Sequence, residues 1–202
     1  MTVSAHDVAA HILQREGPMS AMKLQKLLYY SQSWHLVWAD RPLFREEIQA
    51  WANGPVVYEI FDQHRGRFSV GGSWPAGDVS RLGEIEKATI DTVCDHYSKL
   101  TGQALSALTH SEDPWRNARG GLPATARSTA VISLESMAGF YGALAQDAEA
   151  EVVDEIEWGE YADYAEDYAE EMRAEMAREY EAEAREYEAE IAREYEDPSQ
   201  YM

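Results

Sequence analysis

Apolar residues recur every three or four positions through most of the first 146 residues, which is the spacing of one face of an α-helix. The pattern is clearest between Ser20, which can cap a helix, and Asp40-Arg41-Pro42, which ends one. We therefore predict a long helix over 21–39 with one apolar, aromatic face. That face consists of Leu24, Leu27, Leu28, Ser31, Trp34, His35 and Trp38.

Capping and breaking residues define the other helices. Ser4, with Asp7 three residues later as a short capping-box partner, predicts a first helix that ends at Gly17-Pro18. After the turn signal Asn53-Gly54-Pro55 we expect a helix over 56–66, with Pro55 near its first turn. Further helices are expected from Asp78 or Ser80 to Leu100, from Thr101 to His110, around Pro114, and from Ser133 to Ala145.

Strand signals are few. Residues 68–70 and 130–132 are candidates for short strands, and the stretch "GRFSVGGS" (66–73) predicts a hairpin turn, since it lacks the lysine of a phosphate-binding loop. The fold class expected is mainly α: a compact helical domain with at most a small β-hairpin, followed by a long acidic amphipathic C-terminal helix.

That last helix is predicted over about 160–196 by a stripe of apolar and aromatic residues. The stripe consists of Tyr161, Tyr164, Tyr168, Met172, Met176, Tyr180, Tyr187, Ile191 and Tyr195, separated by 3, 4, 4, 4, 4, 7, 4 and 4 positions. Tyrosine and methionine are common contact residues, so we expect the stripe to bind a partner. The alternatives are a solvated or disordered acidic run, and packing on the same chain or on a second copy.

Charge divides the chain near residue 147, before this stripe begins. The formal net charge is −20, and residues 147–202 hold 22 Asp and Glu against 4 Lys and Arg, whereas residues 1–146 hold 15 against 13. We therefore predict two parts, a globular domain over 1–146 and an acidic Tyr/Glu-rich helical tail over 147–202. The acidity opposes direct binding to nucleic acid, including by the helix–turn–helix outline of the first two helices, and favours a protein partner with a basic surface.

The cysteine content and the hydropathy of the sequence indicate the cellular compartment in which we expect the protein. Cys94 is the sole cysteine, so no intramolecular disulfide can form, and it lies among apolar positions typical of a small core residue. The first residues lack the basic and long apolar regions of a signal peptide, and no uninterrupted apolar run reaches 18 residues. We expect a cytoplasmic protein without a membrane span.

Motifs that carry chemistry are scarce. His6 and His11 are five residues apart, which is poor spacing for a zinc pair on one helical face, and neither a phosphate-binding loop nor an H-E-x-x-H motif is present. We therefore expect no cofactor, no metal site and no catalytic residues. His35, beside Trp34 and Trp38, is most simply a hydrogen-bonded, half-buried histidine.

The stretch "THSEDPW" (109–115) has two interpretations. His110, Glu112 and Asp113 could form an acid/base or metal constellation. Alternatively, Ser111 or Asp113 caps a helix whose first turn holds Pro114, and Trp115 packs into the core. The second interpretation is favoured, because one local cluster offers no second set of ligands.

Three ordered segments, "MKLQKLLYYSQSWHLV", "LFREEIQAWANGPVV" and "LSALTHSEDPW", resemble the Panacea domain, also described as the SocA-like antitoxin or phage-associated protein domain. The resemblance covers about residues 5–145 and excludes the tail. The motif positions, for which we expect structural roles, are Leu24, Lys26, Leu27, Tyr30, Trp51, Gly54, Pro55, His110, Pro114 and Trp115.

The resemblance implies a mainly helical domain without enzymatic activity. Proteins of this kind resemble antitoxins that neutralise many unrelated toxins, including small alarmone-synthetase-like ones, by direct protein–protein binding. We therefore expect an antitoxin whose cognate toxin has a basic surface, such as that of an RNA- or nucleotide-acting enzyme, with the acidic helix contributing to occlusion. The alternative is a proteolytic adaptor or phage-associated interaction module that delivers or modulates a partner protein. The sequence also leaves open whether the protein forms a homo-oligomer.

Overall fold

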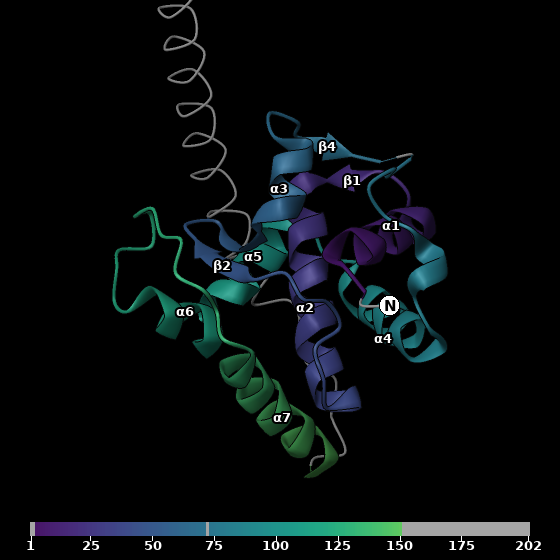
Figure 1. Ribbon diagram of the computed structural model, residues 1–202. Helices are drawn as coiled ribbons and strands as arrows, with labels where there is room; N and C mark the ends of the chain where they lie inside the picture. The colour runs from purple at the N-terminus through teal and green to yellow at the C-terminus, as the bar shows by residue number, and fades with distance from the viewer. Residues whose placement is uncertain (1–2, 72, 151–202) are drawn as a thin grey trace, which may run out of the picture. The chain divides into compact units, whose positions relative to one another are not determined.

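The computed structural model describes residues 3–71 and 73–150, which form a mainly α-helical domain (Figure 1). The predicted fold class is confirmed for this part of the chain, while the acidic helix lies outside the described residues. The elements, in order, are α1 (Ala5–Glu16), β1 (Met19–Ser20), α2 (Ala21–Ala39), β2 (Ile48–Trp51), β3 (Gly54–Val57), α3 (Tyr58–His64), β4 (Ser69–Val70), the 3₁₀ helix η1 (Val79–Arg81), α4 (Glu84–Tyr97), α5 (Gly102–Ser111), α6 (Asp113–Arg119) and α7 (Leu134–Ala150).

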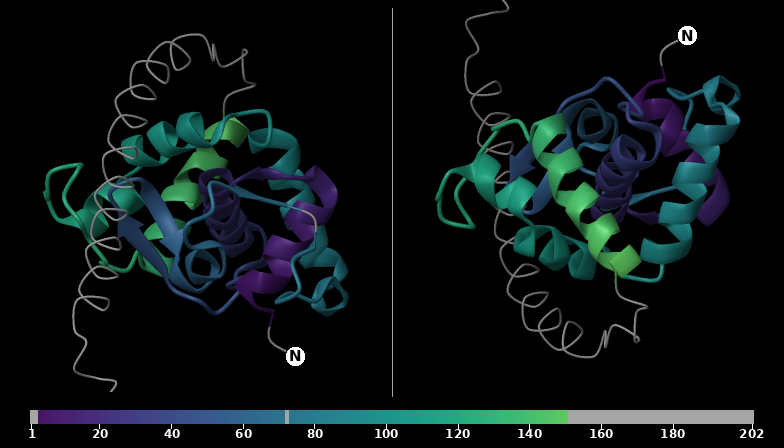
Figure 2. Two further views of the ribbon diagram at one scale, coloured as in Figure 1. Left: turned by 90° about the horizontal axis from the view of Figure 1, so that it is seen from above. Right: turned by 90° about the horizontal axis from the view of Figure 1, so that it is seen from below.

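Helix α2 is the centre of the domain, and α1, α4, α5, α7 and β3 all pack against it. Figure 2 shows α2 end-on with the other elements around it. Residues 24–33 of α2 are buried without a break. The predicted apolar face is therefore only part of the buried surface, because a helix enclosed on all sides must bury its polar positions as well.

The predicted helix starts are confirmed where a side chain caps the backbone. Ser4 and Asp7 form a full capping box at the start of α1, and Ser20 and Thr101 accept hydrogen bonds from the backbone N–H groups of Lys23 and Ala104. These caps are local in sequence, which is why the pattern of residues predicts them well.

The helix predicted over 56–66 is wrong in its first part. Gly54–Val57 is strand β3, which pairs antiparallel with β2 in the register Ile48↔Val57 to Trp51↔Gly54, and α3 begins only at Tyr58. Pro55 has no N–H to donate to a ladder, yet it is tolerated here in a two-stranded pair.

A second small sheet joins distant parts of the chain. Met19 pairs with Val70 and Ser20 with Ser69, both antiparallel. The hairpin turn predicted in the stretch 66–73 is therefore wrong for Ser69 and Val70, because they form a strand that pairs with residues about fifty positions earlier. The strand expected near 130–132 is present as a single bridge between Val131 and Gln49 of β2.

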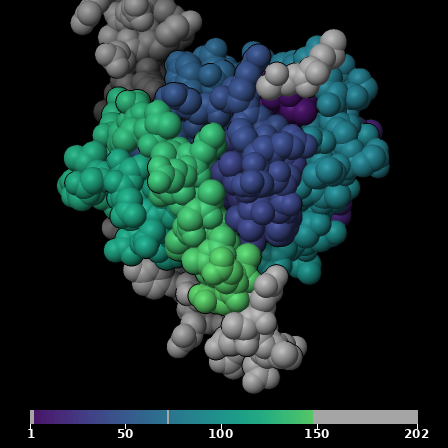
Figure 3. Space-filling view, turned by 60° about the horizontal axis from the view of Figure 1, so that its bottom comes forward, coloured from purple at the N-terminus to yellow at the C-terminus, as the bar shows by residue number. Residues whose placement is uncertain are grey.

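The helix expected from Asp78 or Ser80 is divided in two. Asp78 caps the short η1, Leu82 then takes an extended, buried conformation, and α4 begins after Gly83. The last helix, α7, begins as predicted after Ser133 and continues to Ala150. Figure 3 shows α7 at the surface, beside the end of α2 and the residues that follow it.

Candidate interaction surface and its buried support

Two consecutive side chains of α2 hold the β2–β3 hairpin. The amide of Gln25 accepts a hydrogen bond from the N–H of Val57 at 2.9 Å and donates one to its carbonyl at 3.2 Å. Next to it, the ammonium of Lys26 donates to the carbonyl of Pro55 at 3.2 Å. Strand β3 is therefore bonded to β2 on one side and to α2 side chains on the other.

Gly54 provides the room that Lys26 needs. Its φ of +96° is a conformation that residues with a side chain rarely adopt. A Cβ at this position would lie 2.6 Å from Cε of Lys26 and 2.8 Å from Oγ1 of Thr109. Burial lowers the pKa of Lys26 to about 7, since the enclosed ammonium is far from water.

Helices α5 and α6 hold the hairpin from another direction. Ser106 donates to the carbonyl of Asn53 at 2.9 Å, Trp115 to that of Trp51 at 2.9 Å, and Arg119 to that of Ala50 at 3.0 Å. Side chains from α2, α5 and α6 thus bond to five backbone carbonyls of the hairpin, those of residues 50, 51, 53, 55 and 57.

His110 belongs to this support. Its ring stacks on that of Trp115, with centroids 4.0 Å apart, and the guanidinium of Arg119 lies over Trp115 at 4.8 Å from the ring centroid. Burial, together with the nearby positive charges of Lys26 and Arg119, lowers the pKa of His110 to about 3. His110 is therefore a neutral packing residue near pH 7.

A second buried cluster joins α7 to α2. The carboxylate of Glu112 accepts hydrogen bonds from the hydroxyls of Tyr29 and Tyr30, both at 3.1 Å, and of Tyr141 at 2.8 Å. We call these four residues the tyrosine–glutamate cluster. Tyr97 extends it, because its ring stacks on Tyr30 with centroids 4.0 Å apart.

Burial sets the electrostatics of this cluster. It raises the pKa of Glu112 to about 7, although the three hydroxyls that donate to the carboxylate oppose the shift. It also raises the pKa of Tyr29, Tyr30 and Tyr141 well above the usual value, so these hydroxyls remain protonated donors.

The acid/base constellation considered for residues 109–115 is not assembled. His110 stacks on Trp115, Glu112 points among the tyrosines, and Asp113 is 63% exposed beside Arg116. The capping interpretation is wrong about its residues: Glu112 is the N-cap of α6 without a side-chain cap, and Ser111 donates to the carbonyl of Leu108. Its other part is confirmed, since Trp115 is buried.

Two further expectations about burial, for His35 and for Cys94, can be compared with the structure. His35 is fully buried rather than half-buried; its Nδ1 lies 2.9 Å from Oγ1 of Thr89, while its Nε2 has no partner among the described residues. Cys94 is buried, as predicted, and burial raises the pKa of its thiol to about 12.

Most of the motif positions lie in this support. Leu24, Lys26, Leu27, Tyr30, Gly54, Pro55, Pro114 and Trp115 are buried, and Trp51 and His110 are half-buried. Sequence reasoning missed Gln25, Glu112, Tyr141 and Arg119 as members. An acidic residue that follows an apolar helix, in a chain with adjacent tyrosines, was the available signal for Glu112.

The hairpin and α3 present an aromatic surface. The ring of Trp51 lies 4.8 Å from that of Phe61 and 6.4 Å from that of Tyr58, and Tyr58 is 43% exposed. Arg65 covers Phe61 at 5.2 Å and donates to the Tyr58 hydroxyl at 3.0 Å. We define the aromatic surface as Trp51, Tyr58, Phe61 and Arg65.

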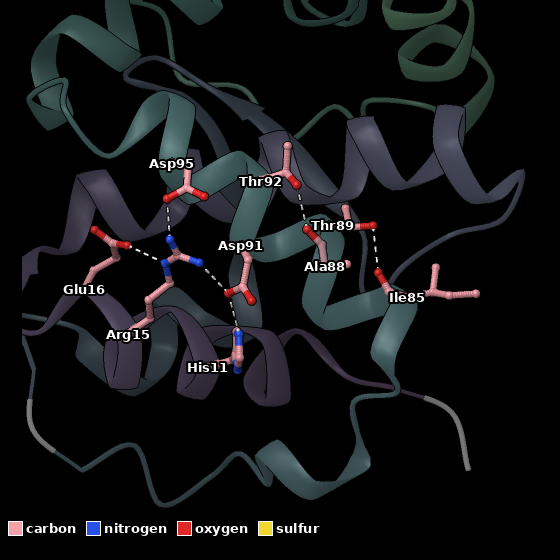
Figure 4. Close-up of polar contacts among 9 residues, drawn as sticks. All are labelled: His11, Arg15, Glu16, Ile85, Ala88, Thr89, Asp91, Thr92 and Asp95. Carbon is pink, nitrogen blue, oxygen red and sulfur yellow. Dashed lines mark hydrogen bonds and ion pairs between the residues drawn. The ribbon is translucent and has the colours of Figure 1, made fainter.

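Helices α1 and α4 are joined by a network of charged side chains (Figure 4). Asp91 lies 2.9 Å from Nε2 of His11 and 2.8 Å from Arg15, which also pairs with Glu16 and Asp95. A shallow pocket of about 430 Å³ beside it is lined by these helices. Within residues 3–71 and 73–150, no three His, Cys, Asp or Glu side chains are grouped to hold a metal ion.

The candidate partner-binding residues of the tail lie outside the described residues. They are Tyr161, Tyr164, Tyr168, Met172, Met176, Tyr180, Tyr187 and Ile191. For the part of the chain that is described, no helix combines the length and the apolar character needed to cross a membrane.

Comparison with known proteins gives one match. No curated protein and no solved structure matches the chain. Residues 24–116, just under half of the chain, match the family model described as antitoxin SocA-like, Panacea domain. The match spans the α2 motif, the hairpin and the α5–α6 junction, which are the elements joined by the buried side chains above. Residues 24–116 are therefore similar to the antitoxin SocA-like, Panacea domain, and this similarity supports a general antitoxin-type role.

Proposed function

We propose that this protein is the antitoxin of a toxin–antitoxin pair and neutralises its cognate toxin by direct protein–protein binding. The family match over residues 24–116 is the observation that carries this proposal. The domain supplies the fold and part of the interface, and the acidic residues 147–202 cover a basic surface of the toxin.

The described contacts support a binding role. The polar groups buried beneath the hairpin bond to backbone carbonyls or to one another, as in a rigid scaffold. The scaffold holds an exposed aromatic surface, and aromatic residues together with arginine are enriched where proteins bind each other.

The charge distribution supports a role for the tail. Residues 147–202 carry 22 acidic against 4 basic side chains, so a basic partner surface is the electrostatic match. A toxin that acts on RNA or nucleotides would expose such a surface at its active site.

The test is co-expression with the product of the neighbouring gene. We expect that product to stop growth alone, and the full chain to restore growth and to co-purify with it as a stable complex. A toxic product that the chain neither binds nor rescues contradicts the proposal. Accelerated, protease-dependent loss of the toxin would instead indicate a proteolytic adaptor.

The contribution of the tail needs its own comparison. Removing residues 147–202 as a whole is expected to weaken rescue, and a cut after Ala150 is the matched control that leaves α7 complete. If both truncated chains rescue as well as the full chain, the tail is dispensable for neutralisation.

A further inference from the structure

The chain between α6 and α7 forms the outer edge of the hairpin sheet (Figure 1). The N–H of Ala50 donates to the carbonyl of Ala130 at 2.8 Å, and the N–H of Ile132 donates to the carbonyl of Ile48 at 2.8 Å. These two bonds flank the pair Gln49 and Val131.

In an antiparallel ladder, the residues of a pair flanked in this way point their own N–H and C=O groups away from each other. Gln49 therefore directs its groups to Val56 of β3, whereas Val131 directs its groups outward. No described residue bonds to the backbone of Val131, which is 45% exposed. Among the described residues, the outer edge thus presents an unpaired donor and an unpaired acceptor in the geometry of a strand.

The inner edge of the same sheet is closed. The N–H and carbonyl of Val57 bond to Gln25, and the carbonyl of Pro55 bonds to Lys26. Another strand could therefore be added to this sheet only beside residues 128–132.

The outer edge is continuous with the aromatic surface. Side chains alternate between the faces of a strand, so Gln49 and Trp51 share the outward face of β2, and the register adds Val131 to it. Trp51 donates to the side chain of Gln49 at 2.8 Å and contacts Phe61 and Tyr58 on its other side. A strip of side chains therefore runs from the edge to α3.

We propose that the toxin docks an extended segment beside residues 128–132, as an added strand that lays apolar side chains towards the aromatic surface. The proposal rests on the antitoxin function proposed above. An extended backbone is the partner that matches a free N–H and C=O on a strand edge, because a helix satisfies these groups internally. Apolar side chains at alternate positions of the added strand match the outward face of β2.

The test is a matched pair of variants in the full chain, measured against the toxin encoded by the neighbouring gene. Val131→Pro removes the outward N–H and leaves the two bonds to β2 in place, whereas Val131→Ala keeps the N–H and removes only the two γ-methyl groups. We expect Val131→Pro to bind the toxin about five- to tenfold more weakly than Val131→Ala, since one net hydrogen bond is lost. The melting temperatures of both variants check that the domain is folded.

Hydrogen exchange of the unsubstituted chain provides a second measurement that needs no variant. The amide of Val131 should exchange rapidly in the free chain and slowly in the complex. The proposal that the toxin docks at this edge is overturned if exchange at Val131 is unchanged in a stable complex, or if the two variants bind the toxin equally. Neither result contradicts the proposed antitoxin function. A wild-type chain that does not bind the toxin overturns both proposals.

A second copy of the chain could occupy the same edge. Sedimentation of the chain alone distinguishes this case: a dimer that Val131→Pro converts to a monomer means that the edge pairs with itself, which contradicts toxin docking there. A monomer in both forms agrees with the proposal.

Discussion

At the scale of single residues, the buried contacts of α2 include groups that are costly to bury. Lys26 and Glu112 are both enclosed, and burial moves the pKa of each to about 7 from opposite directions. Each is tolerated because it bonds to fixed partners, the carbonyl of Pro55 for Lys26 and three tyrosine hydroxyls for Glu112.

The structural role of Gly54 can be tested by substituting it with alanine. Gly54→Ala adds backbone strain and places a Cβ 2.6 Å from Cε of Lys26, so we expect a loss of about 2–4 kcal/mol in the free energy of unfolding. Gly66→Ala is the matched control, because Gly66 has a φ of +74° with nothing within 4 Å, and we expect it to lose about 1 kcal/mol. Urea denaturation measures both, and equal losses would show that the close approach to Lys26 is unimportant.

We expect Glu112 to make the stability of the folded chain depend on pH. Its pKa in the folded chain is about 7 against an ordinary 4.5, so the folded state binds more protons than the unfolded state between these values. Stability should therefore fall as pH rises from 4.5 to 7, by on the order of 2–3 kcal/mol. Glu112→Gln should remove this slope, whereas Asp113→Asn, at an exposed carboxylate, should keep it. An unchanged slope in Glu112→Gln would refute the assignment.

We expect Lys26 to affect the stability of the folded chain at pH values above those governed by Glu112. Its pKa is about 7 in the folded chain against an ordinary 10.5, so the unfolded state binds more protons between these values and stability should rise with pH there. Lys26→Met should flatten the rise over this range, and Lys99→Met, at an exposed position, should not. Denaturation curves between pH 7 and 10 measure the difference; a slope that survives in Lys26→Met assigns the rise to another group.

At the scale of secondary-structure elements, the capped helix starts could be predicted and the strands of the hairpin could not. Ser4, Ser20 and Thr101 act within three residues of themselves, so their caps follow from the sequence. By contrast, Gly54–Val57 becomes a strand because it pairs with β2 and bonds to Gln25, thirty-two residues away from Val57. The tyrosine–glutamate cluster was missed for the same reason, since Glu112 and Tyr29 meet only through the packing of helices.

The attachment of α7 depends on the tyrosine–glutamate cluster. Tyr141→Phe removes the 2.8 Å hydrogen bond to a buried carboxylate, so we expect a loss of about 1.5–3 kcal/mol in the free energy of unfolding. Tyr58→Phe, whose hydroxyl bonds to exposed Arg65, is the control and should lose less than about 0.5 kcal/mol. Faster amide exchange along α7 in Tyr141→Phe would locate the effect; equal losses in the two variants would contradict it.

At the scale of the whole molecule, the chain combines a nearly neutral domain with a strongly acidic segment. Residues 1–146 hold 15 acidic and 13 basic side chains, and residues 147–202 hold 22 and 4. Composition alone predicts this division, while the partner of the acidic segment does not follow from charge.

Salt dependence tests the proposed role of that segment. If residues 147–202 cover a basic toxin surface, the affinity of the full chain for the toxin should fall markedly between 0.05 and 0.5 M salt, since the Debye length shortens from roughly 14 to 4 Å. The chain cut after Ala150 should show a much weaker dependence. Equal salt dependence of the two chains would mean that the tail makes no electrostatic contact.

The two glutamines of α2 have a consequence for how the chain avoids mispairing. Gln25 bonds to both the N–H and the carbonyl of Val57, and Gln32 likewise bonds to the N–H of Leu43 and to the N–H and carbonyl of Phe44. The Gln25 amide thereby substitutes for a strand beside β3, while the Gln32 amide, about 10.5 Å away along the helix, holds the bend at Leu43. A helix thus acts as a template that fixes strand β3 and the loop before β2, and it protects β3 from the edge-to-edge aggregation to which short strands are prone.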